Sequence, residues 1–181
     1  MSRRYKFHNP EGLYFVSFAT VYWLSVFIRE EYSTILVENL KYCRQNKGLE
    51  LYAWCIMPNH LHLIYRTKDN YPEKVLGHFK SYTNRKLIEA INQNPQESRK
   101  EWLLWMMERA ANKSSNVKNM QFWQHHNKPI ELWSPDVIDE KLNYIHENPV
   151  TAGFVSNPED WKYSSAIDYA GGIGLIPLDF M

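Results

Sequence analysis

The spacing of apolar residues in the first third of the chain predicts a strand, a helix and a hairpin. The run GLYFVSFATVYW, residues 12–23, is rich in aromatic and β-branched residues and follows Asn-Pro-Glu-Gly, which favours a strand. Apolar residues then recur at helical spacing over 29–48, with Gly48 as the stop. Two more strands are expected at 49–56 and 60–66, because the proline and asparagine between them suit a tight hairpin turn.

The remaining pattern predicts more helices and one further strand. The expected elements are helices over 72–92 and 98–111, a polar loop over 112–119 and a strand over 120–132. A last helix is expected from Ser134, which suits an N-cap, because Pro135 follows at the first helical position and acidic residues lie in the first turn. We expect this helix to end before Pro149.

The order strand, helix, hairpin, helix, strand is typical of a split β-α-β sheet with helices mainly on one face, in the α+β class. The 181 residues fit a single domain spanning 1–181. The glycines of YAGGIGLIP have no helical pattern behind them, so we expect residues 165–181 to form a flexible tail.

Composition indicates a folded protein without an overall basic field. Hydrophobic residues make up 44% of the chain and the formal net charge is +1, so nucleic-acid binding would have to rest on local patches. Cys43 and Cys55 make no disulfide framework and fit core thiols of a reducing compartment. We find no signal core, no long apolar run and no GxxxxGK[ST] or GxGxxG motif, and therefore expect a cytoplasmic protein without a membrane partner or nucleotide-binding loop.

Two histidines inside the hairpin are the first candidate for chemistry. In CIMPNHLHLIYR, residues 55–66, His60 and His62 share one face of a strand, roughly 7 Å apart along it. They could be ordinary half-buried histidines, or two ligands of a divalent metal. A metal needs further ligands, which must come from elsewhere in the chain.

The last predicted helix offers such groups. Tyr144 and Asn148 lie four residues apart and therefore on one face, beside Lys141. If this face packs near the histidines, Asn148 could complete the metal site and Tyr144 could attack a phosphate that the ion polarises. Alternatively, Tyr144 is an aromatic at the helix edge and Asn148 a helix stop.

The motifs together resemble one known family. MPNHLHLI, followed further along by YIHENPVTAGFV and DWKYSS, is similar to the single-tyrosine HUH transposases, in particular the branch of REP-associated tyrosine transposases. The resemblance runs from the YFVSFAT strand to Tyr163. It implies a ferredoxin-like fold with an antiparallel sheet, and an extra C-terminal helix that carries the tyrosine.

The resemblance also implies an activity. Such enzymes cleave and rejoin single-stranded DNA that carries hairpins, using Mg²⁺ or Mn²⁺ and a 5′-phosphotyrosyl intermediate. Carried over, His60 and His62 would be the metal ligands and Tyr144 the nucleophile, while Asn148 matches the position of a polar third ligand. Rejoining would need no ATP, because the phosphotyrosyl link conserves the energy of the phosphodiester bond.

A rival tyrosine and a set of basic residues complete the candidates. Tyr82 lies in the predicted helix 72–92 among lysine and arginine residues, and is the chief competing nucleophile. The residues that we expect to contact DNA are Arg3, Arg4, Lys6, Lys80, Arg85, Lys86 and Lys141. Any one of them could instead be an ordinary solvated surface residue.

Two other functions remain open at this point. A protein of the same fold could bind DNA hairpins without catalysis, or a metal-dependent hydrolase could cleave phosphodiesters with water. A homodimer is possible, in which Tyr144 of one chain would serve the histidines of the other.

Overall fold

The computed structural model describes residues 7–69, 71–114 and 119–180. Three of the residues that we expect to contact DNA, Arg3, Arg4 and Lys6, lie outside these ranges.

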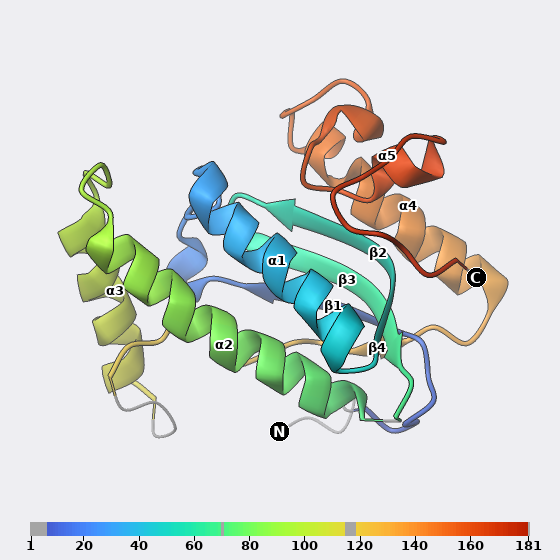
Figure 1. Cartoon of the computed structure of the whole chain (residues 1–181), viewed down its shortest axis with the longest axis horizontal. Helices are drawn as coiled ribbons and strands as arrows, with labels where there is room; N and C mark the ends of the chain where they lie inside the picture. Colours follow the sequence, from blue (N-terminus) through green and yellow to red (C-terminus); the bar gives the residue numbers. More distant parts are fainter. Residues whose placement is uncertain (1–6, 70, 115–118, 181) are drawn as a thin grey trace.

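A four-stranded antiparallel sheet forms the centre of the fold (Figure 1). Its strands, in the order β2-β3-β1-β4, are β2 (Leu49–Met57), β3 (His60–Thr67), β1 (Tyr14–Ala19) and β4 (Ile130–Glu131). The hairpin between β2 and β3 turns at Pro58 and Asn59, as the sequence predicts. The predicted α+β class and split β-α-β arrangement are confirmed.

Helices cover both faces of this sheet. The helices are α1 (Glu30–Asn46), α2 (Pro72–Gln93), α3 (Lys100–Asn112), α4 (Pro135–Thr151) and α5 (Ala166–Tyr169). Figure 1 shows α1 and α2 side by side over one face, with α3 beyond α2, while α4 and α5 lie together next to β2. Two short 3-10 turns are η1 (Val21–Trp23) and η2 (Pro158–Asp160).

The alternation of β3 side chains divides the interior into two cores. Leu61, Leu63 and Tyr65 join the larger core, which contains the apolar residues of α1 and α2. Ile64 joins a smaller core on the other face, together with Ile145 of α4. Because side chains alternate along a strand, His60 and His62 share the face of Ile64 and therefore point toward α4.

Two predicted elements differ from the structure. Of the strand expected over 120–132, only Ile130–Glu131 pairs with β1. Trp123 makes a single isolated bridge to Thr20, the residue after β1. Lys128 has φ 42°, which breaks the extended backbone just before β4. The last helix was expected to end before Pro149, but it continues to Thr151. Pro149 lies in its last turn, and beyond it the Ala152 N–H still donates to the Asn148 carbonyl oxygen (3.0 Å).

The C-terminal segment that we expected to be a flexible tail packs against the sheet instead. The Asp179 carboxylate accepts hydrogen bonds from the Arg44 guanidinium (2.9 and 3.1 Å) and from the Leu51 backbone N–H (2.9 Å). The Ile176 side chain is fully buried. The glycines of this segment predict local flexibility, but the contacts that hold it involve Arg44 and Leu51, far away in the sequence.

Both cysteines are buried and unpaired, as expected. Burial raises the pKa of the Cys55 thiol to about 12, so it stays protonated and unreactive at neutral pH. In the part of the chain that the structure describes, we find no helix with the length and apolar character needed to cross a membrane.

Candidate active site

His60 and His62 form a closely spaced pair at the start of β3. Their ring centroids are 4.7 Å apart and their planes are inclined by 82°. Two imidazoles that bind one cation through nitrogens at about 2.1 Å, with ligand angles of roughly 90–110°, have centroids roughly 4.6–5.3 Å apart. The pair therefore has the spacing of two ligands of a single metal ion.

His62 is buried with unsatisfied ring nitrogens. Its side chain is 2% exposed, and within the described residues neither ring nitrogen has a hydrogen-bond partner. Burial, together with the proximity of the titratable His60 ring, lowers the pKa of His62 to about 3. The ring is therefore neutral at physiological pH, which is the form that binds metals. A buried polar group without a partner costs roughly 1–3 kcal/mol, and a bound cation would remove that cost.

The tautomer of His60 follows from its neighbour Asn59. His60 Nδ1 lies 2.6 Å from the Asn59 side-chain oxygen, which can only accept, so Nδ1 carries the proton. The Nε2 atom of His60 then keeps the lone pair that a metal requires. Burial lowers the pKa of His60, which keeps this ring neutral as well.

Asn148 of α4 supplies an amide next to this pair. The Asn148 side chain lies near enough to His60 to offset part of the lowering of the His60 pKa by burial. Among the described residues, no group of three or more His, Cys, Asp or Glu side chains could hold a metal ion. The Asn148 amide oxygen is a donor that could join the two imidazoles, and two neutral imidazoles with an amide oxygen would fit a divalent cation.

Tyr144 lies against the histidine pair from the side of α4. Its ring meets the His62 ring edge-on, with centroids 5.2 Å apart, and the side chain is 48% exposed. Phe15 of β1 stacks on His62 at 5.7 Å and contacts Tyr144 at 5.9 Å. The Lys141 ammonium lies 5.9 Å from the Tyr144 ring centroid. A phenol, an ammonium group and the candidate metal ligands thus meet at one accessible place.

Packing on both sides of α4 fixes the orientation of Tyr144. The helix begins at Ser134, whose hydroxyl accepts a backbone N–H in the first turn (3.4 Å). Ile145 is buried against the sheet, while His146 on another face of the helix hydrogen bonds to the Ser165 hydroxyl (2.9 Å). These contacts stop α4 from rotating and keep Tyr144 beside His62.

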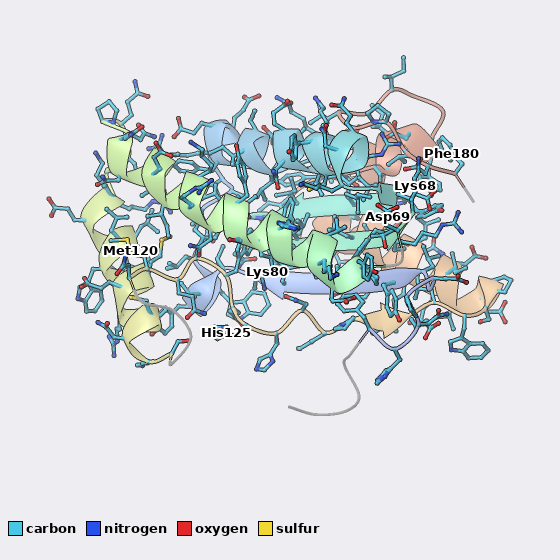
Figure 2. The ribbon with its side chains drawn as sticks, turned by 60° about the horizontal axis from the view of Figure 1, so that its bottom comes forward. Lys68, Asp69, Lys80, Met120, His125 and Phe180 are labelled. Atoms are coloured by element: carbon cyan, nitrogen blue, oxygen red, sulfur yellow. The ribbon has the colours of Figure 1, made fainter. Side chains whose placement is uncertain are left out.

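Lys80, which we expected to contact DNA, is engaged within the chain. Its ammonium donates to the Gln124 carbonyl oxygen (2.8 Å) and to the Asn127 side-chain oxygen (2.5 Å), so it ties α2 to the segment below it (Figure 2). Burial lowers the pKa of Lys80 to about 8. These contacts count against the predicted role, and the sequence could not reveal them because they depend on the path of residues 121–128.

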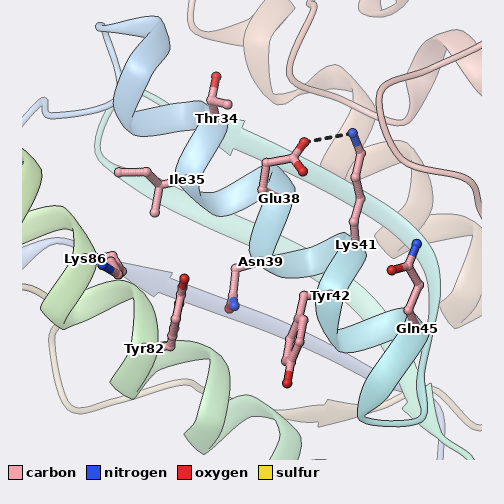
Figure 3. A pocket seen from close by; sticks show the side chains of 9 residues that line it. All are labelled: Thr34, Ile35, Glu38, Asn39, Lys41, Tyr42, Gln45, Tyr82 and Lys86. Atoms are coloured by element: carbon pink, nitrogen blue, oxygen red, sulfur yellow. Dashed lines mark hydrogen bonds and ion pairs between the residues drawn. The ribbon is translucent and has the colours of Figure 1, made fainter.

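Tyr82 lies on the opposite side of the sheet from His62. It projects from α2 into a groove of about 690 Å³ between α1 and α2, where it faces Tyr42 (Figure 3). Lys86 lines the same groove and pairs with Glu89 (2.9 Å). Arg85 is exposed on α2 near the Tyr82 ring. Within one chain, these α2 residues are therefore separated from the histidine pair by the sheet.

The structure adds residues that we did not single out from the sequence. Asn59 reads as an ordinary turn residue, but its amide links the His60 ring to the Trp23 carbonyl oxygen (3.4 Å). Phe15 reads as a core residue, but it lies on the same face of the sheet as His62. The adjacency of Asn59 to His60 was the one signal available in the sequence.

Comparisons with known proteins agree on one family. Residues 13–118 match the family model described as "Transposase IS200 like". A Haemophilus influenzae protein named "Putative REP-associated tyrosine transposase" is 29% identical over 161 residues, which cover 85% of this chain and 79% of that protein. A solved structure of a REP-associated tyrosine transposase bound to a REP hairpin shares the fold, with a TM-score of 0.67 at 18% identity, over 100% of this chain and 92% of that one. The matched region of the family model contains the histidine pair but ends before Tyr144.

Proposed function

This chain belongs to the IS200-like transposase family, and from that premise we propose that it cleaves and rejoins single-stranded DNA with Tyr144 as the nucleophile. One observation carries the proposal. The unsatisfied nitrogens of buried His62 lie beside the half-exposed ring of Tyr144, with the ring centroids 5.2 Å apart. A nucleophile next to a preformed pair of metal ligands is the arrangement that metal-assisted phosphoryl transfer requires.

In the proposed reaction, the Tyr144 hydroxyl oxygen attacks the phosphorus of the scissile phosphodiester and gives up its proton. The bond from phosphorus to the 3′ oxygen of the preceding nucleotide breaks, and that oxygen takes up a proton to leave a 3′-OH. The product is a 5′-phosphotyrosyl bond, and attack by another 3′-OH reverses the step. Since one ester bond replaces another, rejoining needs no ATP.

The residues around Tyr144 have separate roles in this proposal. A Mg²⁺ or Mn²⁺ ion held by His60, His62 and Asn148 would polarise the scissile phosphate and offset its negative charge. Lys141, whose ammonium lies 5.9 Å from the Tyr144 ring centroid and pairs with Glu140 (2.7 Å), would add positive charge beside the nucleophile. The protonated Nδ1 of His60 keeps its ring in one orientation through Asn59.

We further propose that the DNA partner carries hairpins. The solved relative was bound to a REP hairpin, and the Haemophilus influenzae relative carries the name of the same group of transposases. Repeats that flank the gene are therefore the first source of substrates to test.

A covalent-adduct assay tests the proposal. Single-stranded DNA that contains a flanking hairpin is labelled at its 3′ end, because the phosphotyrosyl bond joins the protein to the 3′ fragment. The DNA is incubated with protein and Mn²⁺ or Mg²⁺ and run on a denaturing gel. We expect a shifted band that EDTA and Tyr144→Phe abolish, and that the matched control Tyr82→Phe retains.

The other outcomes separate the two competing functions. Tight binding without any adduct would indicate a hairpin-binding protein without catalysis. Metal-dependent cleavage that persists in Tyr144→Phe would indicate a hydrolase that uses water.

A further inference from the structure

A short turn beside His60 exposes two aromatic side chains. In η1, directly after β1, Tyr22 is 41% exposed and Trp23 is 56% exposed. Both residues have left-handed backbone conformations, with φ 52° and φ 57°. Residues other than glycine rarely adopt such angles, and those that do cluster at functional sites, where the surrounding structure enforces the strain.

Hydrogen bonds from three directions hold this turn in place. The Thr20 hydroxyl donates to the Leu24 carbonyl oxygen (2.9 Å), and the Val21 N–H donates to the Phe122 carbonyl oxygen (2.8 Å). The Asn59 amide donates to the Trp23 carbonyl oxygen, and its oxygen accepts from His60. One side chain therefore couples the exposed tryptophan to an imidazole of the candidate metal site.

The two aromatics line a groove between η1, the end of α3 and the segment around Gln124, and Trp23 connects it to the candidate metal site. Its volume is about 450 Å³, and Lys113, Gln124 and His125 are among the other lining residues (Figure 2 labels His125). Trp23 also meets the His60 ring edge-on, with centroids 5.7 Å apart. The groove therefore adjoins the place where the scissile phosphate would lie.

The charge of this groove suits a nucleic-acid backbone. The Lys113 ammonium lies 5.8 Å from the Tyr22 ring centroid, at the end of α3. None of the described residues that line the groove is acidic. An exposed aromatic face next to a cation is the combination that binds single-stranded nucleic acid, since every base can stack and every phosphate is negative.

We infer that this groove binds the single-stranded nucleotides next to the phosphate that Tyr144 attacks, with one base stacked on Trp23. The inference rests on the proposed function, because it takes the scissile strand to be single-stranded DNA. Trp23 would position the strand and take no part in the chemistry. Stacking would hold the neighbouring nucleotide, and Lys113 would neutralise part of its backbone charge.

Binding of unstructured DNA tests this inference without requiring cleavage. The probe is fluorescein-labelled oligothymidine of about 12 nucleotides, within the usual site size for single strands. Its anisotropy is followed with the full chain in EDTA. Base stacking on an aromatic residue changes affinity by roughly five- to a hundredfold, so we expect Trp23→Ala to weaken binding about tenfold. Trp23→Phe, which keeps an aromatic face, should stay within about threefold of wild type.

A matched control separates Trp23 from exposed tryptophans in general. Trp102 on α3 is 49% exposed, close to the value for Trp23, and does not line the groove. Trp102→Ala should bind the probe like wild type. Equal affinity of wild type and Trp23→Ala would overturn the inference, as would an absence of measurable binding by wild type, or an equal loss in Trp102→Ala.

The result is independent of the proposed reaction. Binding that depends on Trp23, in a protein that forms no adduct on any hairpin, would support the groove and refute the transesterase. A normal adduct with unchanged oligothymidine affinity in Trp23→Ala would support the transesterase and refute the groove. Thermal unfolding of each variant verifies that the substitution has not unfolded the chain.

Discussion

On the face of the sheet that α1 and α2 cover, β3 contributes Leu61, Leu63 and Tyr65, all buried in the larger apolar core. The Tyr65 hydroxyl, the polar atom among these side chains, donates to the Pro72 carbonyl oxygen (2.9 Å). On the face that α4 covers, the same strand contributes His62, whose ring nitrogens have no partner within the described structure. One strand thus provides satisfied packing on one side and unsatisfied donor atoms on the other. From this difference we expect the surroundings of His62, on the α4 face, to serve binding rather than stability.

The largest effect that we expect is loss of activity without loss of stability in His62→Leu. Removing a metal ligand should lower cleavage by on the order of 10²–10³-fold or more, which corresponds to several kcal/mol of lost charge stabilisation. The free energy of unfolding in the absence of metal should stay the same or increase, because leucine replaces two buried nitrogens without partners. Denaturant unfolding in EDTA and the adduct assay measure the two quantities. Marked destabilisation of the metal-free protein would contradict the comparison of the two faces.

The neighbouring substitution on the other face should have the opposite effect. Leu61→Ala removes a fully buried side chain from the larger core and should lower the free energy of unfolding by roughly 2–5 kcal/mol. The protein that remains folded should keep its affinity for Mn²⁺, because Leu61 points away from the histidines. Denaturant unfolding and calorimetric titration with Mn²⁺ test this pair of expectations. Lost metal affinity in the folded fraction would show that the two faces are not separate.

Lys80 should affect stability rather than DNA binding. Burial lowers the pKa of Lys80 from 10.5 in the unfolded chain to about 8 in the folded chain. Between pH 8 and pH 10.5 the unfolded chain therefore binds more protons at Lys80 than the folded chain does. The contribution of Lys80 to the free energy of unfolding therefore increases as the pH rises. Relative to Lys80→Met, the wild type should gain about 2 kcal/mol between about pH 7 and pH 9.5. Parallel stability profiles of the two proteins would mean that Lys80 is not buried.

The smallest effect should come from the lysines of the two faces. Lys141→Met removes a charge near Tyr144 and should slow adduct formation about tenfold, equivalent to about 1.4 kcal/mol. Lys86→Met on the α1 and α2 face should change the rate by less than about twofold, since exposed ion pairs contribute little. Single-turnover rates at saturating DNA measure both. A larger effect of Lys86→Met would place DNA across the face that we regard as structural.

Local patterns were sufficient to predict the central elements of the fold. Apolar spacing places the helix at 29–48 and the hairpin at 49–66 within a few residues of α1, β2 and β3. The alternation in HLHLIY also predicts that both histidines share a face. Such patterns depend on neighbouring residues alone, and can therefore be recognised without knowledge of the tertiary structure.

Features that depend on distant contacts could not be predicted. The composition of 120–132 favours a strand, but the backbone turns at Lys128 and only Ile130–Glu131 pairs. Asp179 looks like part of a loose end, yet it binds Arg44. The coupling of Trp23 to His60 requires a turn and a hairpin that are far apart in the sequence to meet at Asn59.

The most direct test of the central claim is to identify the residue that carries the DNA. The covalent adduct is digested with trypsin and nuclease, and the modified peptide is sequenced by mass spectrometry. The two candidate tyrosines fall on separate peptides, 142–162 and 81–85, and each is the sole tyrosine of its peptide. The account predicts a nucleotide phosphate on Tyr144 in peptide 142–162. A modified Tyr82 in peptide 81–85 would contradict it and move the active site to the opposite face of the sheet.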